Sequence, residues 1–413
     1  MIKKHGAIFI NNNSDKQGFI ECLLQGPIPI AFRHLEGQQG ALFSKLALDE
    51  FIEEEVLHDH KILTRHSKQS LQSMSSGERK KALLRHIKSI DPEFLILDNP
   101  FDNLDVTSVK DLKRQLTKMA DKIAMVQIIS RANDLLPFIK DHYLLDINTV
   151  ISVDNSKRDL VGAPIALYQD DIPAPLQKIE FKDEYLIKLK DVSVSYDGKP
   201  ILHDINWKIR KGDFWQLKGS NGSGKTTLLS MITGDNPKGY GQDLLLFGRK
   251  KGSGESIWEI KKKIGYFTPA MIDRFKGYHS LENMLISGLM DSIGLYVQPT
   301  EIQIRIAKQW LQLIGMEKLR DTYFHDLSMG QQRLIMCIRA MIKYPLLLIL
   351  DEPTAGLDDQ SATLFVTLVN KIANESDTAI IFVSHRDEPG LQANMVYELI
   401  PNEKGSLGNS KNI

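Results

Sequence analysis

A glycine-rich loop in the second half of the chain combines the residue types that bind phosphate. It reads Gly219-Ser-Asn-Gly-Ser-Gly-Lys225-Thr226-Thr227, with the spacing G-x-x-x-x-G-K-[ST]. Its glycines let the backbone approach phosphate oxygens closely, and successive amides can then point at the anion. Lys225 would supply charge to the β- and γ-phosphates, and the Thr226 hydroxyl suits Mg²⁺. The candidate phosphate-binding residues are Gly219, Ser220, Asn221, Gly222, Ser223, Gly224, Lys225, Thr226 and Thr227.

The elements that must position this loop are also visible in the sequence. Residues 215–218 predict the end of a short strand, and residues 228–232 have helical character. A strand, such a loop and a helix in this order form a P-loop. The expected fold class is therefore α/β.

A pair of carboxylates follows a second predicted strand. The all-apolar run 346–350 is typical of a strand buried on both faces of a parallel sheet. It delivers Asp351 and Glu352 to the carboxyl end of that sheet, where ligands of α/β proteins bind. We expect Asp351 to hold Mg²⁺, and Glu352 to orient or deprotonate an attacking water.

Two further motifs surround the carboxylates in the sequence. Residues 327–333, Leu-Ser-Met-Gly-Gln-Gln-Arg, open a predicted helix, and Ser328 and Gly330 give its N-terminus an anion-binding character. Residues 378–383 predict a strand that ends in Ser384-His385. In this position, His385 is suited to sensing the γ-phosphate.

The ordered set of motifs between Tyr196 and His385 resembles the ABC-type ATPases, which are P-loop NTPases that use ATP and Mg²⁺. The resemblance implies that Tyr196 stacks on adenine. It also implies that signature residues contact ATP held by a different nucleotide-binding domain, because such domains close head to tail around two ATP molecules. The residues with this implied role in the second half are Ser328, Gly330, Gln331 and Asp358.

One position departs from the family pattern. The segment Ile264-Gly-Tyr-Phe-Thr-Pro269 has Pro269 where the family usually has glutamine. That glutamine helps to connect Mg²⁺ and the attacking water to movement of a transmembrane partner. Its absence weakens the expectation of standard coupling to a permease.

The first half repeats the second at equal spacings. Ser75-Ser76-Gly77 resembles the signature, and Asp98 lies 21 residues after Gly77, as Asp351 does after Gly330 (98 − 77 and 351 − 330). Asp105 follows Asp98 by 7 residues, as Asp358 follows Asp351 (105 − 98 and 358 − 351). Equal offsets across three elements indicate a duplication, with Ser75, Ser76, Gly77 and Asp105 as the first half's signature and trans-contact residues.

The catalytic positions of the first copy are altered. Asn99 stands where Glu352 stands, and an amide cannot take a proton from water. Arg131 stands in the place of His385. Lys16 matches Lys225, but three other side chains, Ile10, Asn13 and Asp15, replace the glycines, and Gln17 replaces the hydroxyl. The site of Lys16, Asp98, Asn99 and Arg131 is therefore expected to be degenerate.

The predicted domains are a degenerate nucleotide-binding domain at 1–154, a linker at 155–185 and a complete domain at 186–413. Lys16 and Gly77 are 61 residues apart, against 105 between Lys225 and Gly330 (77 − 16 and 330 − 225). The first copy should therefore have a smaller subdomain between its loop and its signature.

These motifs suggest one hydrolytic site per chain if the two halves pair. The loop at Lys225 would then face Ser75, Ser76 and Gly77, with Glu352 and His385 supplied by its own half. Two chains pairing through their intact halves is the alternative.

The composition of the chain bears on which classes of partner it could bind and where it could be located. Lys+Arg and Asp+Glu are both 52 in 413 residues, so the formal net charge is zero, and no basic bias indicates nucleic acid. The 2 cysteines, Cys22 and Cys337, form no zinc or disulfide pattern. No signal peptide or membrane span is visible. We expect a cytoplasmic protein, with the inner membrane face as a peripheral alternative and any pore in another chain.

The second half most resembles a narrower tandem group, the ModF-like proteins, named from molybdate transport. The resemblance covers residues 191–203, 233–240 and 246–261. It implies the ATPase component of a transport system with a separate permease and a molybdate-type oxyanion as cargo. The alternative is a tandem ATPase that acts on ribosomes, nucleic acid or another assembly, although residues 155–185 lack the long helical linker of translation factors.

Overall fold

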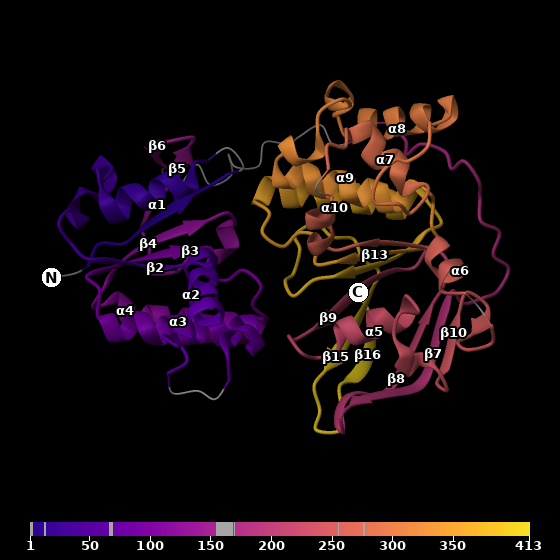
Figure 1. Ribbon diagram of the computed structural model, residues 1–413, viewed down its shortest axis with the longest axis horizontal. Coiled ribbons are helices and arrows are strands. Elements are labelled where there is room, and N and C mark those ends of the chain that lie inside the picture. Colours follow the sequence, from indigo (N-terminus) through magenta and orange to yellow (C-terminus); the bar gives the residue numbers. More distant parts are fainter. Residues whose placement is uncertain are drawn as a thin grey trace. The chain divides into compact units, whose positions relative to one another are not determined.

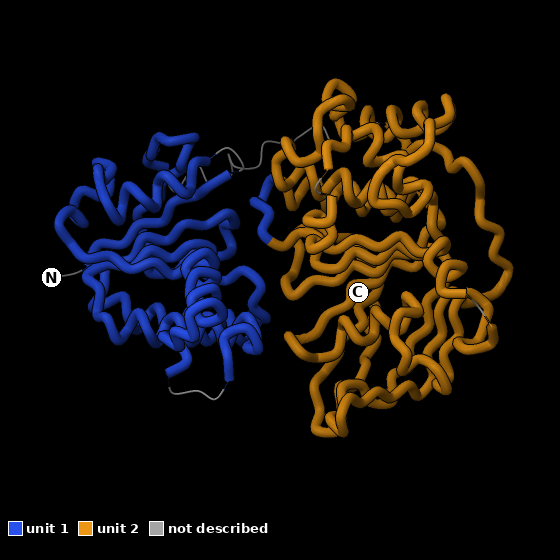
Figure 2. The backbone as a smooth tube through the Cα atoms, viewed as in Figure 1, with its two compact units in different colours: residues 1–163, 356–360 blue, residues 164–355, 361–413 orange. Residues whose placement is uncertain are grey.

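The computed structural model describes residues 3–11, 14–65, 69–153, 168, 170–254, 256–275 and 277–413. The chain forms two compact units, shown in Figure 2. The first comprises residues 1–163 and 356–360, and the second comprises residues 164–355 and 361–413. Each unit contains a mostly parallel sheet with helices, which confirms the predicted α/β class.

The first unit is built on a six-stranded sheet in the order β2-β3-β4-β1-β5-β6. All neighbouring strands are parallel except β5 and β6. Its strands and longer helices are β1 (Gly6–Phe9), α1 (Lys16–Gln25), β2 (Gly40–Phe43), α2 (Lys45–His58), α3 (Ser76–Ile90), β3 (Phe94–Asp98), α4 (Val106–Ala120), β4 (Ala124–Ile129), β5 (Asp141–Asp146) and β6 (Thr149–Ser152).

Alternation along the strands gives this sheet two apolar faces. In β3, Phe94 and Ile96 join a core with the buried side of α1, whereas Leu95 and Leu97 pack with α3 and α4. Successive side chains of a strand point to opposite faces, so an uninterrupted apolar strand requires helices on both sides. Figure 1 shows this sandwich, with α1 on one side of the sheet and α3 and α4 on the other.

The second unit contains two sheets. Its strands and longer helices are β7 (Ile187–Tyr196), β8 (Lys199–Ile209), β9 (Phe214–Gly219), α5 (Lys225–Ile232), β10 (Asp243–Leu246), β11 (Arg249–Lys250), α6 (Ile257–Lys262), β12 (Ile264–Phe267), α7 (Leu281–Gly288), α8 (Glu301–Leu313), α9 (Met329–Met341), β13 (Leu347–Asp351), α10 (Asp359–Glu375), β14 (Ala379–Val383), β15 (Met395–Ile400) and β16 (Leu407–Asn412).

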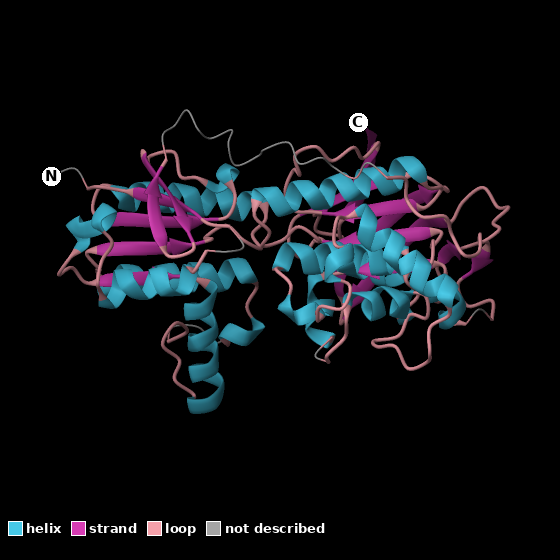
Figure 3. Cartoon of the chain, turned by 90° about the horizontal axis from the view of Figure 1, so that it is seen from above, coloured by secondary structure: helices cyan, strands magenta, loops and turns pink. Residues whose placement is uncertain are grey.

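The larger sheet of this unit has the order β12-β13-β14-β9-β15-β16, and the smaller antiparallel sheet has the order β11-β10-β7-β8. A single core joins the two sheets around α5, whose Leu228 and Leu229 are buried with Leu217 of β9 and Val192 of β7. Figure 3 shows helices on both sides of the strands. The P-loop segment therefore lies between a rigid strand and a helix that is fixed by packing.

The two large sheets have the same topology. Reading each order from its edge, β2, β3, β4, β1, β5 and β6 correspond one by one to β12, β13, β14, β9, β15 and β16. This match supports the duplication that the motif spacings indicated. No described residues of the first unit form a counterpart of the four-stranded antiparallel sheet. Between its loop and its signature helix, the first copy has α2 where the second has α6, α7 and α8.

The predicted linker comprises residues 155–185. Residues 155–167 and residue 169 lie outside the described residues. Residues 170–185 contain no helix or strand and lie against the second unit. The Ile172 amide donates to Glu375 Oε2 at 2.9 Å, and Phe181 packs on the core. Across the described ranges, no helix is both long and apolar enough to cross a membrane.

Candidate functional site

The glycine-rich loop connects β9 to the first turn of α5, which begins at Lys225. Gly224 has a φ of 93°, and a Cβ there would lie 2.7 Å from Leu202 Cδ2, so only glycine fits. None of the described side chains caps the N-terminus of α5. The first amides of a helix have no intrahelical acceptor, so this N-terminus is arranged for an anion.

Lys225 is positioned by the loop itself. Its Nζ donates to the carbonyl oxygens of Gly219 at 2.8 Å and Ser220 at 3.1 Å, which holds the ammonium across the loop. Thr226 is exposed beside it. The buried Ser223 Oγ has no partner among the described residues. The predicted cation and hydroxyl thus lie in the first turn of α5, next to the glycine-rich loop.

Asp351 is the last residue of β13 and Glu352 follows it, so both carboxylates lie at the predicted end of this strand. Tyr266 of β12 donates its hydroxyl to Asp351 Oδ2 at 3.1 Å. Burial and the neighbouring Glu352 raise the pKa of Asp351, whereas the Tyr266 hydrogen bond, Lys225 and His385 lower it. These charges therefore lie within interaction range of one another.

Glu352 has a left-handed backbone with a φ of 53°, and its amide donates to Val383 O at 3.0 Å. This turn brings its side chain to β14, where Glu352 Oε1 contacts Nε2 of His385 directly. His385 Nδ1 is buried and has no partner among the described residues. The structure thus joins two residues that lie in separate motifs of the sequence.

The predicted signature forms the start of α9. Ser328 Oγ accepts from the Gln331 amide at 3.3 Å, and Gln331 Oε1 accepts from the Ser328 amide at 3.0 Å, which is a capping box. Gly330 is buried in the first turn. Arg333 Nη2 donates to Ala355 O at 3.3 Å, so the helix is fixed to the loop after β13.

Tyr196 ends β7 and keeps a partly open ring. It is 39% exposed, its hydroxyl accepts from Asn236 Nδ2 at 2.8 Å, and Lys238 Nζ lies 5.9 Å from the ring centroid. The hydrogen bond orients the ring. An oriented, exposed aromatic is compatible with the predicted stacking on adenine.

The corresponding loop of the first unit has a different arrangement. Lys16 Nζ lies 2.9 Å from Asp98 Oδ2 and 3.1 Å from Oδ1. Asp15 caps α1, because its carboxylate accepts from the Gly18 amide at 2.9 Å. The lysine and the helix N-terminus therefore have anionic partners from the chain itself. Of the three predicted glycine replacements in this loop, Asn13 lies outside the described residues.

Asn99 and Arg131 occupy the positions of Glu352 and His385 in the first unit. These two described side chains do not contact each other as Glu352 and His385 do. Asn99 has a φ of 41°, and its Oδ1 accepts from Ser130 N at 3.1 Å and Ser130 Oγ at 3.2 Å. Arg131 is buried, and within the first unit its Nε donates to Leu357 O at 3.0 Å. Asp358 follows in the same short segment and is buried.

The first unit keeps the shape of its signature. Ser75 and Glu78 form a capping box at the start of α3, equivalent to that of Ser328 and Gln331. Lys80, three residues after Gly77 as Arg333 is after Gly330, donates to Pro100 O at 2.9 Å and Asp102 O at 2.7 Å. Ser76 Oγ donates to Asn103 O at 2.8 Å. Asp105 caps α4 by accepting from the Ser108 amide at 2.7 Å.

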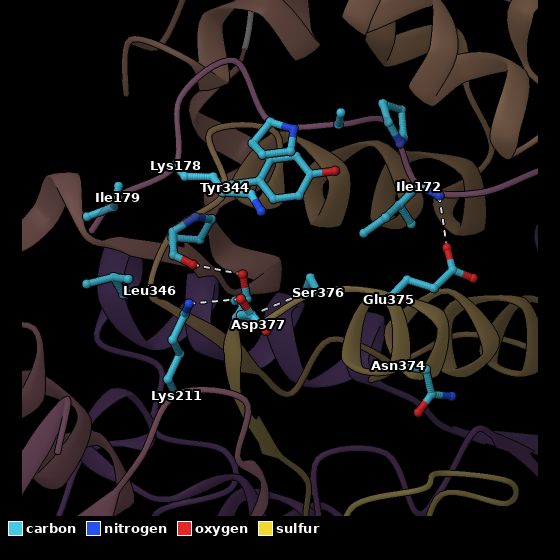
Figure 4. A pocket seen from close by; sticks show the side chains of 15 residues that line it. Ile172, Lys178, Ile179, Lys211, Tyr344, Leu346, Asn374, Glu375, Ser376 and Asp377 are labelled. Carbon is cyan, nitrogen blue, oxygen red and sulfur yellow. Dashed lines mark hydrogen bonds and ion pairs between the residues drawn. The ribbon is translucent and has the colours of Figure 1, made fainter. Parts of the chain in front are cut away.

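A separate pocket of about 430 Å³ lies in the second unit and contains none of the predicted site residues. Figure 4 shows Lys178 and Ile172 on either side of Tyr344, with Lys211 paired to Asp377 below. Pro345 and Thr378, which also line it, precede β13 and β14. The pocket therefore lies at the opposite ends of these strands from the carboxylates.

Sequence reasoning missed Tyr266 and the paired cations Lys80 and Arg333. Tyr266 lies three residues before Pro269, in the segment that departs from the family pattern. Lys80 and Arg333 share an offset of three from their signature glycines, which was a detectable signal in the repeat.

The family model described as ABC transporter matches residues 202–355, which include the loop, the signature and the carboxylates. The ABC transporter ATP-binding protein ModF of Escherichia coli is 37% identical over 329 residues, covering 76% of this chain and 67% of that protein. This chain belongs to the ABC family of ATP-binding proteins, in the ModF-like group. It is an ABC-type ATPase, and its nucleotide is ATP.

Other relatives of this ABC ATPase are also ABC transporter ATP-binding proteins. An uncharacterized ABC transporter ATP-binding protein of Schizosaccharomyces pombe is 31% identical over 326 residues, covering 77% of this chain and 66% of that protein. YlmA of Bacillus subtilis, also an uncharacterized ABC transporter ATP-binding protein, is 33% identical over 204 residues, covering 49% of this chain and 77% of that protein. The chain spans about two thirds of the length of the two longer relatives.

Proposed function

We propose that this ABC ATPase hydrolyses ATP at a single site, which is built on the P-loop of the second unit. The contact of Glu352 with His385 carries the proposal. It places a candidate base and a candidate γ-phosphate sensor together at the end of β13, next to Asp351. In the first unit, Asn99 and Arg131 occupy these two positions, so the first unit has neither the candidate base nor the candidate sensor.

In the proposed reaction, the amides at the start of α5 and Lys225 hold the phosphates of ATP, and Tyr196 stacks on adenine. Glu352 orients a water molecule and accepts its proton as the water oxygen bonds to the γ-phosphorus. The bond from the γ-phosphorus to the bridging oxygen breaks, and ADP leaves. His385, which lies beside Glu352, acts as the γ-phosphate sensor.

The residues present also fit Mg²⁺. A hydroxyl and a carboxylate are hard oxygen donors, and Mg²⁺ is commonly bound by one or two protein oxygens together with substrate phosphates. No cluster of three metal-binding side chains occurs within the described ranges, which is compatible with such a sparse site. Thr226 and Asp351 would hold the ion, which when bound would supply positive charge to the phosphates.

We further propose that the first half supplies the signature for this site. Its α3 keeps the capping box of Ser75 and the cation at position 80, although its own loop is closed by the Lys16–Asp98 pair. Retained signature geometry beside a lost phosphate loop is expected if Ser75, Ser76 and Gly77 act on ATP bound at Lys225. Asp105 would join them, and the first half would serve as a lid.

For the wider role, we propose the ATPase component of a transport system with a separate permease. Similarity to the Escherichia coli relative, an ABC transporter ATP-binding protein, supports this role. A molybdate-type oxyanion is the proposed cargo on the group's name alone. The alternative is an ATPase acting on ribosomes, nucleic acid or another assembly, and Pro269 in place of the usual glutamine favours it.

Measuring ATP turnover and ATP binding of the Glu352→Gln variant tests the proposed hydrolysis. The amide keeps the shape but cannot accept a proton, so turnover should fall about 100-fold or more while ATP binding persists. Asn99→Ala is the matched control in the first half and should leave turnover within about twofold. Normal turnover by Glu352→Gln would refute the assignment. Pull-down of this ATP-trapped variant would show whether a membrane protein or ribosomes associate with it.

A further inference from the structure

Tyr266 is fixed against the candidate metal ligand by the register of the sheet. It lies on β12 opposite Ile349 of β13, so Asp351 is two residues further along the neighbouring strand. Long side chains reach such diagonal neighbours on the same face of a sheet. The Tyr266 hydroxyl does so here, donating to Asp351 Oδ2 at 3.1 Å.

The remaining oxygen of this carboxylate is left for another partner. Among the described residues, Asp351 Oδ1 accepts no hydrogen bond, whereas Oδ2 is held by the tyrosine. A carboxylate that binds a metal through one oxygen needs its other oxygen fixed to hold that orientation, and such supporting contacts set metal affinity. The ring of Tyr266 is itself held against the core of the second unit.

The duplicated half provides an internal comparison. Leu42 lies opposite Ile96 of β3 as Tyr266 lies opposite Ile349 of β13, and Asp98 ends β3 as Asp351 ends β13. Leu42 has no hydroxyl, and Asp98 is instead paired with Lys16. The tyrosine is thus present where the aspartate is without a lysine partner, and absent where the aspartate has one.

We propose that Tyr266 is a positioning residue for metal binding, which holds Asp351 so that its Oδ1 faces Mg²⁺. The tyrosine acts through Asp351 and does not touch ATP. This inference rests on the proposed function, because it assumes that Asp351 holds the ion.

The test removes only the hydroxyl. Tyr266→Phe and the matched control Tyr397→Phe are made in the full chain carrying Glu352→Gln, and Mn²⁺ binding with ATP is followed by electron paramagnetic resonance. Tyr397 loses a comparable buried hydrogen bond, to Asn206 O at 3.0 Å, outside the phosphate loop and the carboxylates. Thermal melting verifies that both variants fold.

We expect Tyr266→Phe to weaken Mn²⁺ binding about 10-fold and Tyr397→Phe to leave it unchanged. With Glu352 intact, Tyr266→Phe should raise the Mg²⁺ concentration for half-maximal hydrolysis, and saturating Mg²⁺ should restore most of kcat. ATP binding in the presence of EDTA should not change. Unaltered Mn²⁺ affinity, or equal loss in both variants, would overturn the proposal for Tyr266 alone. Absence of metal-dependent ATP binding in the parent would instead overturn the proposed function together with it.

Discussion

Lys16 Nζ lies 2.9 Å from Asp98 Oδ2, so in the first unit the lysine and the aspartate of a phosphate site neutralise each other. In the second unit, the equivalent Lys225 donates to the carbonyls of Gly219 and Ser220, and Asp351 accepts from Tyr266. The two copies therefore use the same positions differently. The first lysine and aspartate are paired with each other, whereas we propose that the second set binds a ligand.

The Lys16–Asp98 pair should contribute to stability and not to turnover. Lys16→Ala leaves a carboxylate that is 9% exposed without its cation, and should lower the free energy of unfolding by about 1–2 kcal/mol. Lys4→Ala is the control, because Lys4 and Asp141 form an exposed pair at 3.8 Å, and the change should be below about 0.5 kcal/mol. Urea denaturation measures both. Equal effects of the two substitutions on the free energy of unfolding would show that the Lys16–Asp98 pair contributes no more than the exposed pair.

Gly77→Asp should stop hydrolysis while sparing ATP binding if the two halves of one chain pair. A Cβ at Gly77 would make only an ordinary contact, 3.4 Å from Ser108 Oγ, so the fold should tolerate the substitution. An added carboxylate would repel the γ-phosphate that the signature faces. Turnover should fall at least about 10-fold.

Gly330→Asp distinguishes the alternative pairing. If two chains instead pair through their intact halves, Gly330→Asp should abolish turnover and Gly77→Asp should have little effect. The result is read from steady-state ATPase rates, after circular dichroism has shown that both variants fold.

Tyr196 should contribute stacking energy to ATP binding. Tyr196→Ala should weaken ATP about 5- to 100-fold, since stacking of a base on an aromatic side chain is worth about 1–3 kcal/mol. Tyr196→Phe loses the hydrogen bond from Asn236 but keeps the ring, and should bind within about twofold of the parent. Fluorescent-ATP titration gives both values. A larger loss for phenylalanine than for alanine would exclude stacking.

The raised pKa of Asp351 predicts that the free energy of unfolding of the nucleotide-free protein depends on pH. Burial, followed by Glu352, raises its pKa, so the native state retains this proton at higher pH than the unfolded chain does. The free energy of unfolding therefore falls as pH rises from the ordinary aspartate pKa through the raised one. Asp351→Asn should be more stable than the parent at pH 7, with the gap closing below about pH 4. Melting curves that show a gap widening toward acid would contradict this sign.

The sequence predicted the local parts of the site well. Strand residues 214–219 and 347–351 lie where the apolar runs and the glycine loop indicated, and Glu352 and His385 fall at strand ends. These features depend on short-range patterns, such as a strand followed by glycines, and so they can be read without tertiary information.

Contacts between residues far apart in the sequence could not be read in the same way. Tyr266 and Asp351 are 85 residues apart, and their contact depends on which strands are neighbours. Lys16 and Asp98 are 82 residues apart, and their contact depends on where α1 begins relative to the end of β3. The cap formed by Asp105 was also unforeseen, because the resemblance gave this residue only a role toward nucleotide. An aspartate before a helix is compatible with either role, helix capping or contact with nucleotide, when only the sequence is known.

The central claim is that each chain has one working ATP site, at Lys225. Equilibrium dialysis with radiolabelled ATP and Mg²⁺, in the Glu352→Gln background, counts the nucleotides bound per chain. We predict about one per chain at saturation, unchanged by Lys16→Ala and weakened at least about 10-fold by Lys225→Ala. Two nucleotides per chain, or loss of binding with Lys16→Ala and retention with Lys225→Ala, would contradict the account.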